Sequence, residues 1–411
     1  MIAPTSEKAA SERAGRILVV VIAVAAGSLI ANLYYAQPLI ATIARDLGLG
    51  TALAGTLVSA TQVGYGAGLF LIVPLSDRIE TRRLVLTMVA LVLAALIAIT
   101  ASRSPAMFLA AALALGLCCS VAQVLLPFLA HIVPEERRAV VVGNVMAGVL
   151  TGVMLARPLS LAVSATFGWR AIFWGSGALL MVTGTLLAWL MPRHRPASTL
   201  RYGAILASMA QLLRTQHEVR RRALYQAMMF AAFNMLWAIA PLVLAGRFGL
   251  DPYHVALFAL AGAGGALAAP VGARLVDRGL SHAGTVGAAV VVSLAFLGTI
   301  GAVAALSFAA FLMLTIAIDA GVQINQTLGR MVVFGAAADI RGRVNSLYMT
   351  TLFAGGAIGS TLGSVTYSAG GWPLTAGVAA ALCAGVALLA VRHREPPGGS
   401  MFASPPEGKP S

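Results

Sequence analysis

The chain has 411 residues, of which 59% are hydrophobic and only 10% are charged, and its mean hydropathy is +0.89. Soluble domains carry about a quarter charged residues, so this composition excludes an ordinary soluble protein. The net charge of +14 would suit a nucleic-acid partner. The basic residues, however, fall mainly in loops between apolar stretches, as topogenic signals do, so we expect a lipid bilayer around the chain and no nucleic acid.

Apolar stretches long enough to cross a bilayer follow one another along the chain. A membrane-spanning helix needs about 20 apolar residues, whereas strands of a membrane barrel would show short alternating segments. We therefore predict an all-α polytopic membrane protein with 12 transmembrane helices, at residues 17–40, 51–75, 84–101, 106–132, 138–162, 170–191, 223–246, 254–275, 283–303, 306–332, 344–367 and 372–391.

A hydrophilic, arginine-rich break divides these spans into six and six. Lys and Arg gather in segments that share one side of the membrane if both termini are cytoplasmic, which is the positive-inside pattern. No small-residue cleavage site closes the first apolar run, so we interpret that run as a retained span. The predicted organisation is a cytoplasmic N-terminal tail at 1–16, a six-helix bundle at 17–191, a cytoplasmic linker at 192–222, a second six-helix bundle at 223–391 and a cytoplasmic C-terminal tail at 392–411.

The two halves of the chain resemble each other. The segment VPLSDRIETRR ends the second span and ARLVDRGLSHAG ends the eighth, so Asp77-Arg78 and Asp277-Arg278 occupy matching positions. A repeat of six spans predicts two pseudo-symmetric bundles with a cavity between them, which can rock against each other. A channel or a membrane enzyme has no need of such a repeat.

These segments, together with ANLYYAQPLI and GVMLARPLS, resemble the major facilitator superfamily and its bacterial drug:proton antiporter and sugar-efflux branch. The resemblance covers residues 17–391 and implies the superfamily's fold of two six-helix bundles. Gly143 and Gly152 match the glycine spacing of the antiporter motif in the fifth span. Ala156-Arg157 stands where that motif has Gly-Pro.

Charged residues at the ends of the second and eighth spans are candidate gating residues. The resemblance implies that such charges latch helices of one half together, and arginines also stabilise the partly negative C-terminus of a helix. A solvated topogenic loop is the alternative. The candidates are Asp77, Arg78, Arg82, Arg83, Asp277 and Arg278.

Polar residues inside the spans form a second group. In lipid such side chains turn to the interior of the bundle, where they bond to another helix or to water in a cavity. For each of them, a helix-to-helix hydrogen bond and contact with a substrate both remain open. Together they predict a polar central cavity lined by Asn32, Tyr35, Gln37, Gln62, Gln123, Asn144, Asn234, Trp237, Gln323 and Gln326. Direct substrate contact is expected above all in the first span, at Asn32, Tyr34, Tyr35 and Gln37.

Asp319 lies near the middle of the tenth predicted span, about 20 Å from its outer end. At 100° per residue it shares a helix face with Thr315, Gln323 and Gln326. An unpaired carboxylate at this depth costs at least about 2.5–3.5 kcal/mol, so it must face a cavity, pair with a cation or be protonated part of the time. We predict a proton-coupling site formed by Asp319, as the carboxylate that binds the proton, and Arg157. The alternative is a structural ion pair with Arg157, the cation within the fifth span.

The sequence contains no GxxxxGK[ST] nucleotide-binding loop, so an ion gradient must supply the energy for transport. We predict a secondary transporter and not an enzyme, moving a small organic solute by alternating access through proton-coupled efflux (antiport). Uptake or facilitated transport of a sugar or organic acid is the alternative within transport. A non-transporting membrane sensor or a membrane-embedded enzyme is the alternative from another class.

Partners and location follow from the same features. Cys and His show no metal-ligand spacing, so we expect no cofactor and no metal. The expected partners are a small-molecule substrate and protons. We expect a monomer in the plasma (inner) membrane.

Overall fold

The computed structural model of the chain describes residues 6–133, 135–193, 201–260, 262, 265, 268–335 and 340–393. Within these ranges all regular structure is helical. The first half contains α1 (Ser6–Ala31), η1 (Gln37–Leu39), α2 (Ile40–Asp46), η2 (Thr51–Leu53), α3 (Thr56–Leu71), η3 (Val73–Asp77), α4 (Thr81–Ala101), α5 (Pro105–Cys119), α6 (Ala122–Ile132), α7 (Glu135–Phe167) and α8 (Arg170–Leu190). The remainder contains α9 (Tyr202–Thr215), α10 (His217–Arg247), α11 (Pro252–Ala259), α13 (Ala269–Asp277), α14 (Ser281–Ala304), α15 (Phe308–Gly335) and α16 (Arg341–Arg392).

The described residues of each predicted span fall mainly on helices, whereas residues 261, 263, 264, 266 and 267 of the eighth predicted span lie outside the described residues. Among the described residues, nine helices are long and apolar enough to cross a membrane. One of them, α16, has 52 residues and holds the last two predicted spans. Its backbone breaks at Gly370 and Gly371, and the positive φ of 63° at Gly371 suits glycine, which has no Cβ to clash. The chain is therefore an all-helical polytopic membrane protein, as predicted.

Some helix boundaries differ from the predicted spans. The first span was predicted to run to residue 40, but α1 ends at Ala31 and the chain turns before η1. Pro38 disfavours a continuous helix here, because it lacks an N–H and its ring clashes with the carbonyl four residues earlier. At the other end, α1 already begins at Ser6, within the predicted tail. Similarly, α10 begins at His217, within the predicted linker. The predicted C-terminal tail lies outside the described residues from position 394 onward.

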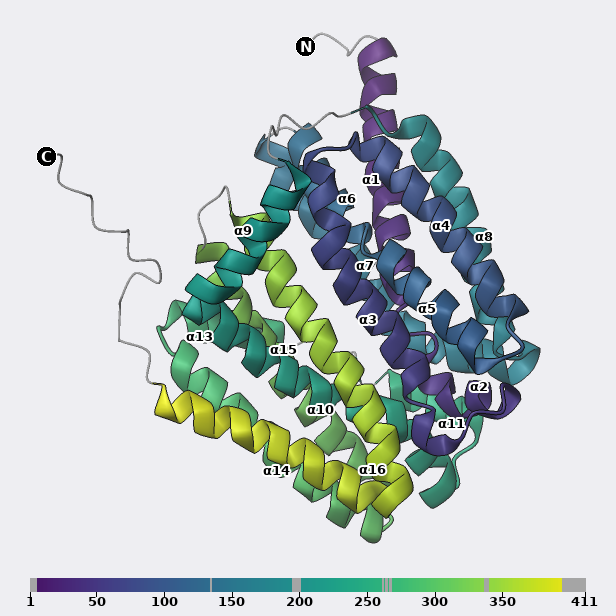
Figure 1. Ribbon diagram of the computed structural model, residues 1–411, viewed down its shortest axis with the longest axis vertical. Helices are drawn as coiled ribbons and strands as arrows, with labels where there is room; N and C mark the ends of the chain where they lie inside the picture. The colour runs from purple at the N-terminus through teal and green to yellow at the C-terminus, as the bar shows by residue number, and fades with distance from the viewer. Residues whose placement is uncertain are drawn as a thin grey trace, which may run out of the picture.

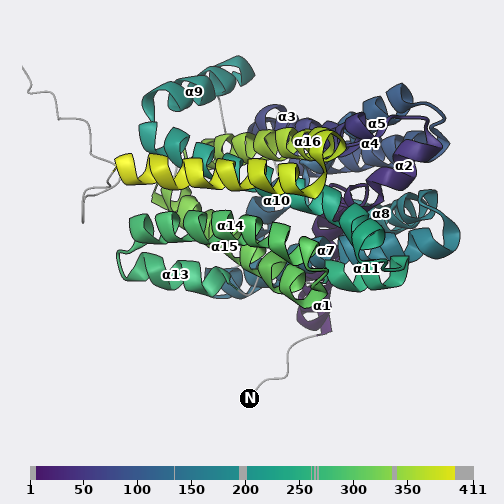
Figure 2. The same ribbon diagram turned by 90° about the horizontal axis from the view of Figure 1, so that it is seen from below.

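The helices form two groups that follow the two halves of the sequence. Figure 1 shows the first half (purple to teal) above and to the right of the second half (green to yellow), and Figure 2 also places α9 at the surface. We call the end where α9 contacts α10, α16 and η3 the linker end, and the opposite end, with η1, η2 and α11, the far end. The halves meet where η1 packs on α10, η2 and α3 on α16, and α11 on α7.

A polar clamp holds the loop after α1 at the far end. The guanidinium of Arg170 donates to Asp46 Oδ2 at 2.6 Å and to the carbonyls of Thr100 and Ser102. The Trp169 indole also donates to Asp46 Oδ2, at 3.1 Å. These hydrogen bonds lower the pKa of the Asp46 carboxyl. The clamp ties α2, α4 and α8 together and fixes the C-terminal end of α2, the short helix that follows η1.

Glycines bring helices within each half into backbone contact. A Cβ built on Gly64 or Gly116 would collide with backbone of the facing helix in the α3–α5 pair. At the crossing of α1 and α7, a Cβ on Gly152 would lie 2.5 Å from the carbonyl oxygen of Gly27. In the second half, Gly355 and Gly359 of α16 abut the backbone of α10. Small residues at such crossings let helices pack closely. This packing matters in a bilayer, because lipid provides no hydrophobic driving force for helix association.

We expect Gly116→Ala to destabilise the chain by about 1–3 kcal/mol, the usual cost of overpacking. Its new methyl group would meet the Thr61 carbonyl oxygen, which is backbone and cannot rotate away. Thermal unfolding of the purified protein in detergent measures the effect. Gly175→Ala is the matched control, because nothing lies within 4 Å of a Cβ there. Equal unfolding temperatures for the two variants would contradict the close-packing argument.

Candidate functional site

A chain of side-chain hydrogen bonds crosses between the two halves. Arg157 Nε on α7 donates to Gln37 Oε1 at 3.0 Å. Gln37 Nε2 in turn donates to Asn234 Oδ1 on α10, also at 3.0 Å. Gln62 Nε2 on α3 donates to the same Asn234 oxygen at 2.6 Å. One asparagine of the second half therefore accepts from two helical elements of the first half.

The same asparagine is held in place by its own helix. Asn234 Nδ2 donates to the carbonyl of Phe230 at 2.8 Å, which fixes the amide so that its oxygen faces the first half. Gln37, Gln62 and Asn234 are all fully buried. A buried amide that lost its partner would cost about 1–3 kcal/mol. The network therefore favours the conformation in which the far ends of the two halves are in contact.

Arg157 lies among aromatic rings from both halves. Its guanidinium carbon is 4.6 Å from the ring centre of Trp237, 5.0 Å from that of Tyr34 and 5.4 Å from that of Phe233. Such cation–π contacts gain strength when they are desolvated, and only 5% of Arg157 is exposed. One guanidinium nitrogen of Arg157, Nη2, is buried and has no hydrogen-bond partner.

Asp319 is joined to Arg157 through the Trp237 side chain. The Trp237 indole N–H donates to Asp319 Oδ1 at 3.0 Å, while the same ring faces the guanidinium. Asp319 is 4% exposed, and its second oxygen, Oδ2, is buried without a hydrogen-bond partner. Among the residues that the structure describes, Asp319 forms no ion pair within 4.0 Å. The charges of Asp319 and Arg157 interact at longer range.

Two glycines allow the chain to pack closely on Asp319. A Cβ at Gly265 would lie 2.5 Å from the Asp319 Cβ, and one at Gly262 would lie 3.3 Å from Asp319 Oδ2. The Gly262 Cβ would also lie 3.1 Å from the Trp237 ring. Any larger side chain at these positions would displace the carboxylate or the indole. At these two positions the glycines therefore leave room for the Asp319 carboxylate and the Trp237 indole.

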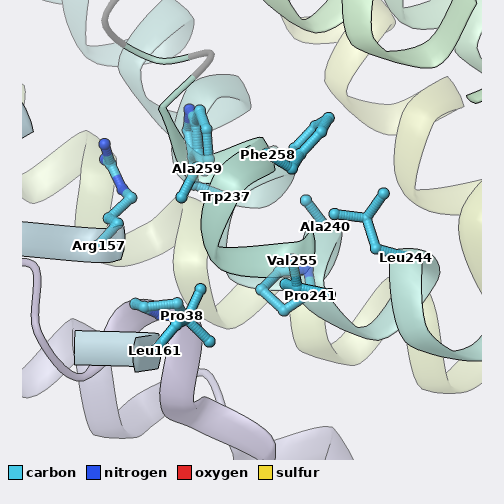
Figure 3. Close-up of a pocket in the computed structure, with 10 residues that line it drawn as sticks. All are labelled: Pro38, Arg157, Leu161, Trp237, Ala240, Pro241, Leu244, Val255, Phe258 and Ala259. Carbon is cyan, nitrogen blue, oxygen red and sulfur yellow. The ribbon is translucent and has the colours of Figure 1, made fainter. Parts of the chain in front are cut away.

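A small pocket lies beside Arg157 between the two halves (Figure 3). The close-up shows Arg157 and Trp237 extending to the same side, with Pro38 and Leu161 on the other. Apart from Arg157, the lining is apolar or aromatic. The lining residues are Pro38, Arg157, Leu161, Trp237, Ala240, Pro241, Leu244, Val255, Phe258 and Ala259.

Three predicted cavity residues hold helices of the first half together. Asn32 donates to the Ser28 carbonyl at 2.8 Å and accepts from Ser176 Oγ at 3.0 Å. The Tyr35 ring makes an edge contact with Phe173. Gln123 donates to the Tyr65 hydroxyl at 3.0 Å. These contacts favour helix-to-helix bonding over substrate contact for the three residues.

The other predicted cavity residues lie apart from the polar network. Asn144 is exposed on α7, toward the linker end from Arg157. Gln323 and Gln326 are half-buried on the helix face of Asp319, and Thr315 on that face is fully buried with its hydroxyl lacking a partner. Their roles remain predictions.

Several contributing residues were missed by sequence reasoning. Phe233 supplies a ring to the Arg157 cage, and a phenylalanine in an apolar span carries no signal of this role. Ser59 bonds across the halves to the Ala357 carbonyl at 2.5 Å and to Thr361 at 2.8 Å. Asn325 donates to Gln226 Oε1 at 2.7 Å. Both amides could have been found by the same rule that selected Asn234, a polar residue within an apolar stretch.

The candidate gating residues lie at the linker end. Asp77, Arg78, Arg83, Asp277 and Arg278 are exposed. Neither aspartate forms an ion pair within 4.0 Å with a residue that the structure describes. Their role as a latch stays a prediction.

Two contacts nevertheless reach between elements at this end. Asp77 interacts electrostatically with Arg343 of α16, in the other half. Arg82 donates to the Ala188 carbonyl and so ties α4 to α8.

Two helical bundles that meet around a buried carboxylate and a buried guanidinium are the arrangement expected of a membrane transport protein. The chain matches the family described as Major Facilitator Superfamily over residues 21–340 and again over 223–410. It belongs to this superfamily and is a secondary transporter, not an enzyme.

Relatives and solved structures agree with this assignment. The chain is 35% identical over 357 residues to "Uncharacterized transporter YgaY" of Escherichia coli O157:H7. The match covers 86% of this chain and 90% of that protein. It is 34% identical over 382 residues to "Probable transporter SCO4007" of Streptomyces coelicolor, and the match covers 92% of this chain and 87% of that protein.

Similar solved structures include a D-xylose-proton symporter, with a TM-score of 0.71 at 15% identity, covering 91% of this chain and 97% of that one. A POT family transporter has a TM-score of 0.72 at 14% identity, and the match covers 92% of this chain and 96% of that one. At these identities the likeness shows the fold alone.

We expect Asn234→Leu to loosen the contact between the far ends of the two halves. The variant strands the amide donors of Gln37 and Gln62, at about 1–3 kcal/mol for each buried group. The open population should then rise at least about fivefold. The measurement is the labelling rate of Ser59→Cys by a thiol reagent, in a chain whose three native cysteines are replaced, because Ser59 is buried between the halves.

Asn32→Leu is the matched control for this experiment. The hydrogen bonds that the Asn32 side chain makes with described residues stay within the first half, so its loss should leave the labelling rate of Ser59→Cys unchanged. If Asn234→Leu also left that rate unchanged, the network would not hold the halves together.

Proposed function

We propose that this transporter moves a small organic solute by alternating access and is driven by protons that bind Asp319. The observation that carries the proposal is the state of this carboxylate: it lies in the middle of α15, is 4% exposed and has one oxygen without a partner. An ionised carboxylate at such depth is costly, and a neutral one is much cheaper. Its charge is therefore expected to change as water gains and loses access.

Efflux in exchange for protons is the first candidate for the direction of transport. It is supported by the resemblance of α7 to the fifth-span antiporter motif, with Gly143 and Gly152 at the motif's spacing. In this scheme the substrate and the proton occupy the site in turn, each displacing the other on opposite sides of the membrane.

Uptake of an organic acid together with protons is the second candidate. It is favoured by the guanidinium of Arg157, whose Nη2 is buried without a hydrogen-bond partner. A facilitated carrier for a sugar would need neither this cation nor a buried acid.

The linker end is proposed to face the cytoplasm of a cell with the chain in its plasma membrane. Support comes from Lys and Arg, which are concentrated in the segments at this end. The far end, with η1, η2 and α11, would then face outward. This orientation places both termini in the cytoplasm, and the chain is proposed to act as a monomer.

We expect Asp319→Asn to abolish gradient-driven transport while leaving passive exchange of substrate. The amide preserves the shape of the carboxyl group and can still accept from Trp237, but it cannot titrate. Transport is measured in everted vesicles, with and without a pH gradient, for a compound whose distribution in cells depends on the chain.

Asp251→Asn provides the control for the loss of an aspartate. Asp251 is an exposed residue that caps the start of α11 and lies outside the site. This variant should transport normally. Full gradient-driven transport by Asp319→Asn would rule out the proton-coupling role.

We expect cysteines placed in α9 to react with a membrane-impermeant thiol reagent only in everted vesicles. Leu213→Cys is suitable, because this residue is exposed on α9. Tyr253→Cys is the control at the far end, where the exposed side chain should react in intact cells instead. The opposite labelling pattern would invert the proposed orientation.

A further inference from the structure

The guanidinium of Arg157 holds a positive charge that no described acid neutralises at contact distance. Only 5% of the residue is exposed, and Nη2 has no hydrogen-bond partner. Among the described residues, the one side-chain hydrogen bond of the guanidinium is the bond that Nε donates to Gln37 Oε1. Cation–π contacts with three rings stabilise the charge, but they leave the N–H donors of Nη2 unsatisfied.

A buried guanidinium in this condition is chemically suited to an anion. Arg presents a rigid planar fork of N–H donors that matches a carboxylate with two parallel hydrogen bonds. A buried charge without a partner costs several kcal/mol in a packed protein, which a ligand carboxylate would recover. Asp319 is not that partner in the structure, because no ion pair within 4.0 Å joins the two among the described residues.

We infer that Arg157 binds the carboxylate of a small organic anion with an apolar body. The inference rests on the proposed function in one respect, the role of Asp319 as the proton site. It adds the chemical class of the substrate and the atoms that recognise it.

The apolar surroundings of Arg157 indicate the rest of the ligand. The adjoining pocket is lined, apart from Arg157, by apolar and aromatic side chains that include Leu161, Leu244 and Phe258. Among the described residues that line the pocket, Arg157 is the one charged side chain, so the lining offers no second cation for a dicarboxylate. One cation beside an apolar wall matches the chemistry of an aliphatic or aromatic monocarboxylate. The cavity of about 10 Å³ is too small for such a ligand in this conformation, so the ligand enters when the halves separate.

The charge balance links this anion to the proton. With Asp319 ionised, Arg157 and Asp319 together carry no net charge, and an added carboxylate would place two anions beside one cation. With Asp319 protonated, the carboxylate and Arg157 again balance. Because uncompensated charge in a buried site is costly, the anion binds together with a proton and not in competition with it. This order corresponds to the second candidate direction, uptake with protons.

The same balance disfavours an organic cation at this position. The aromatic faces that would receive a cation already face Arg157 at 4.6–5.4 Å. A cationic ligand would therefore sit beside a second positive charge in a site of low polarity.

Binding of matched probes to the purified full-length chain tests the inference. Benzoate, benzylamine and benzyl alcohol share one ring and differ in charge, and a series from acetate to octanoate varies the apolar body. Each is titrated at mildly acidic and mildly alkaline pH, with ligand-induced change in thermal unfolding as the measurement. We expect carboxylates to bind, more tightly at acidic pH, and benzylamine and benzyl alcohol not to bind.

Variants of Arg157 assign the binding to its guanidinium. Arg157→Gln should weaken carboxylate binding at least about thirtyfold, the lower range for removing one partner of a buried charge pair. Arg157→Lys keeps the charge without the planar fork and should bind with intermediate affinity, which also covers the case that the glutamine variant does not fold. In Asp319→Asn, binding should persist and lose its pH dependence.

Each remaining result has a defined meaning. Preference for benzylamine, carboxylate binding unchanged in Arg157→Gln and Arg157→Lys, or failure of every carboxylate to bind would overturn the inference. Carboxylate binding that depends on Arg157 but not on pH would support the anion site and reject the proton role of Asp319. The failure of the substrate class is thereby separated from the failure of the proposed coupling.

Discussion

The placement of one carboxylate and one guanidinium among membrane-spanning helices constrains much of this structure. Asp319 belongs to the second half of the chain and Arg157 to the first, and both are nearly fully buried. Charges at this depth are tolerated only where other protein groups or water stabilise them. Trp237 supplies part of that stabilisation to both, donating its N–H to Asp319 and its ring face to Arg157. The contact between the halves at this point therefore depends on the charges that they bury.

Two kinds of helix contact serve different purposes in this molecule. Within each half, glycines place backbone against backbone, as at Gly64 and Gly116, and such contacts have little room to change. Between the halves, near Asn234, contact is made through amide side chains and aromatic rings, which can exchange partners with water. A rocking motion of the two halves requires rigid bundles and an interface whose hydrogen bonds can be replaced by bonds to water.

The repeat in the sequence does not make the site symmetric. Gln123 and Gln323 are separated by 200 residues, as Asp77 and Asp277 are, and so occupy matching positions in the two halves. Gln123 nevertheless bonds to Tyr65, whereas Gln323 is half-buried and its side chain forms no hydrogen bond with a described residue. Asp319 likewise lies in one half only. The duplicated architecture supplies two bundles of similar shape, and the chemistry arises from residues that distinguish them.

The sequence by itself determined the helical membrane fold, because the length and apolarity of each span are local properties that the bilayer selects. It also singled out Asp319, since an acid within an apolar run is costly wherever the helix packs. Only the tertiary structure decided that Trp237 lies between Asp319 and Arg157, and that Gln37 meets Asn234 after a turn that the hydropathy pattern did not reveal. Helical periodicity shows which residues share a face, but which faces meet across the two halves depends on close packing between distant segments.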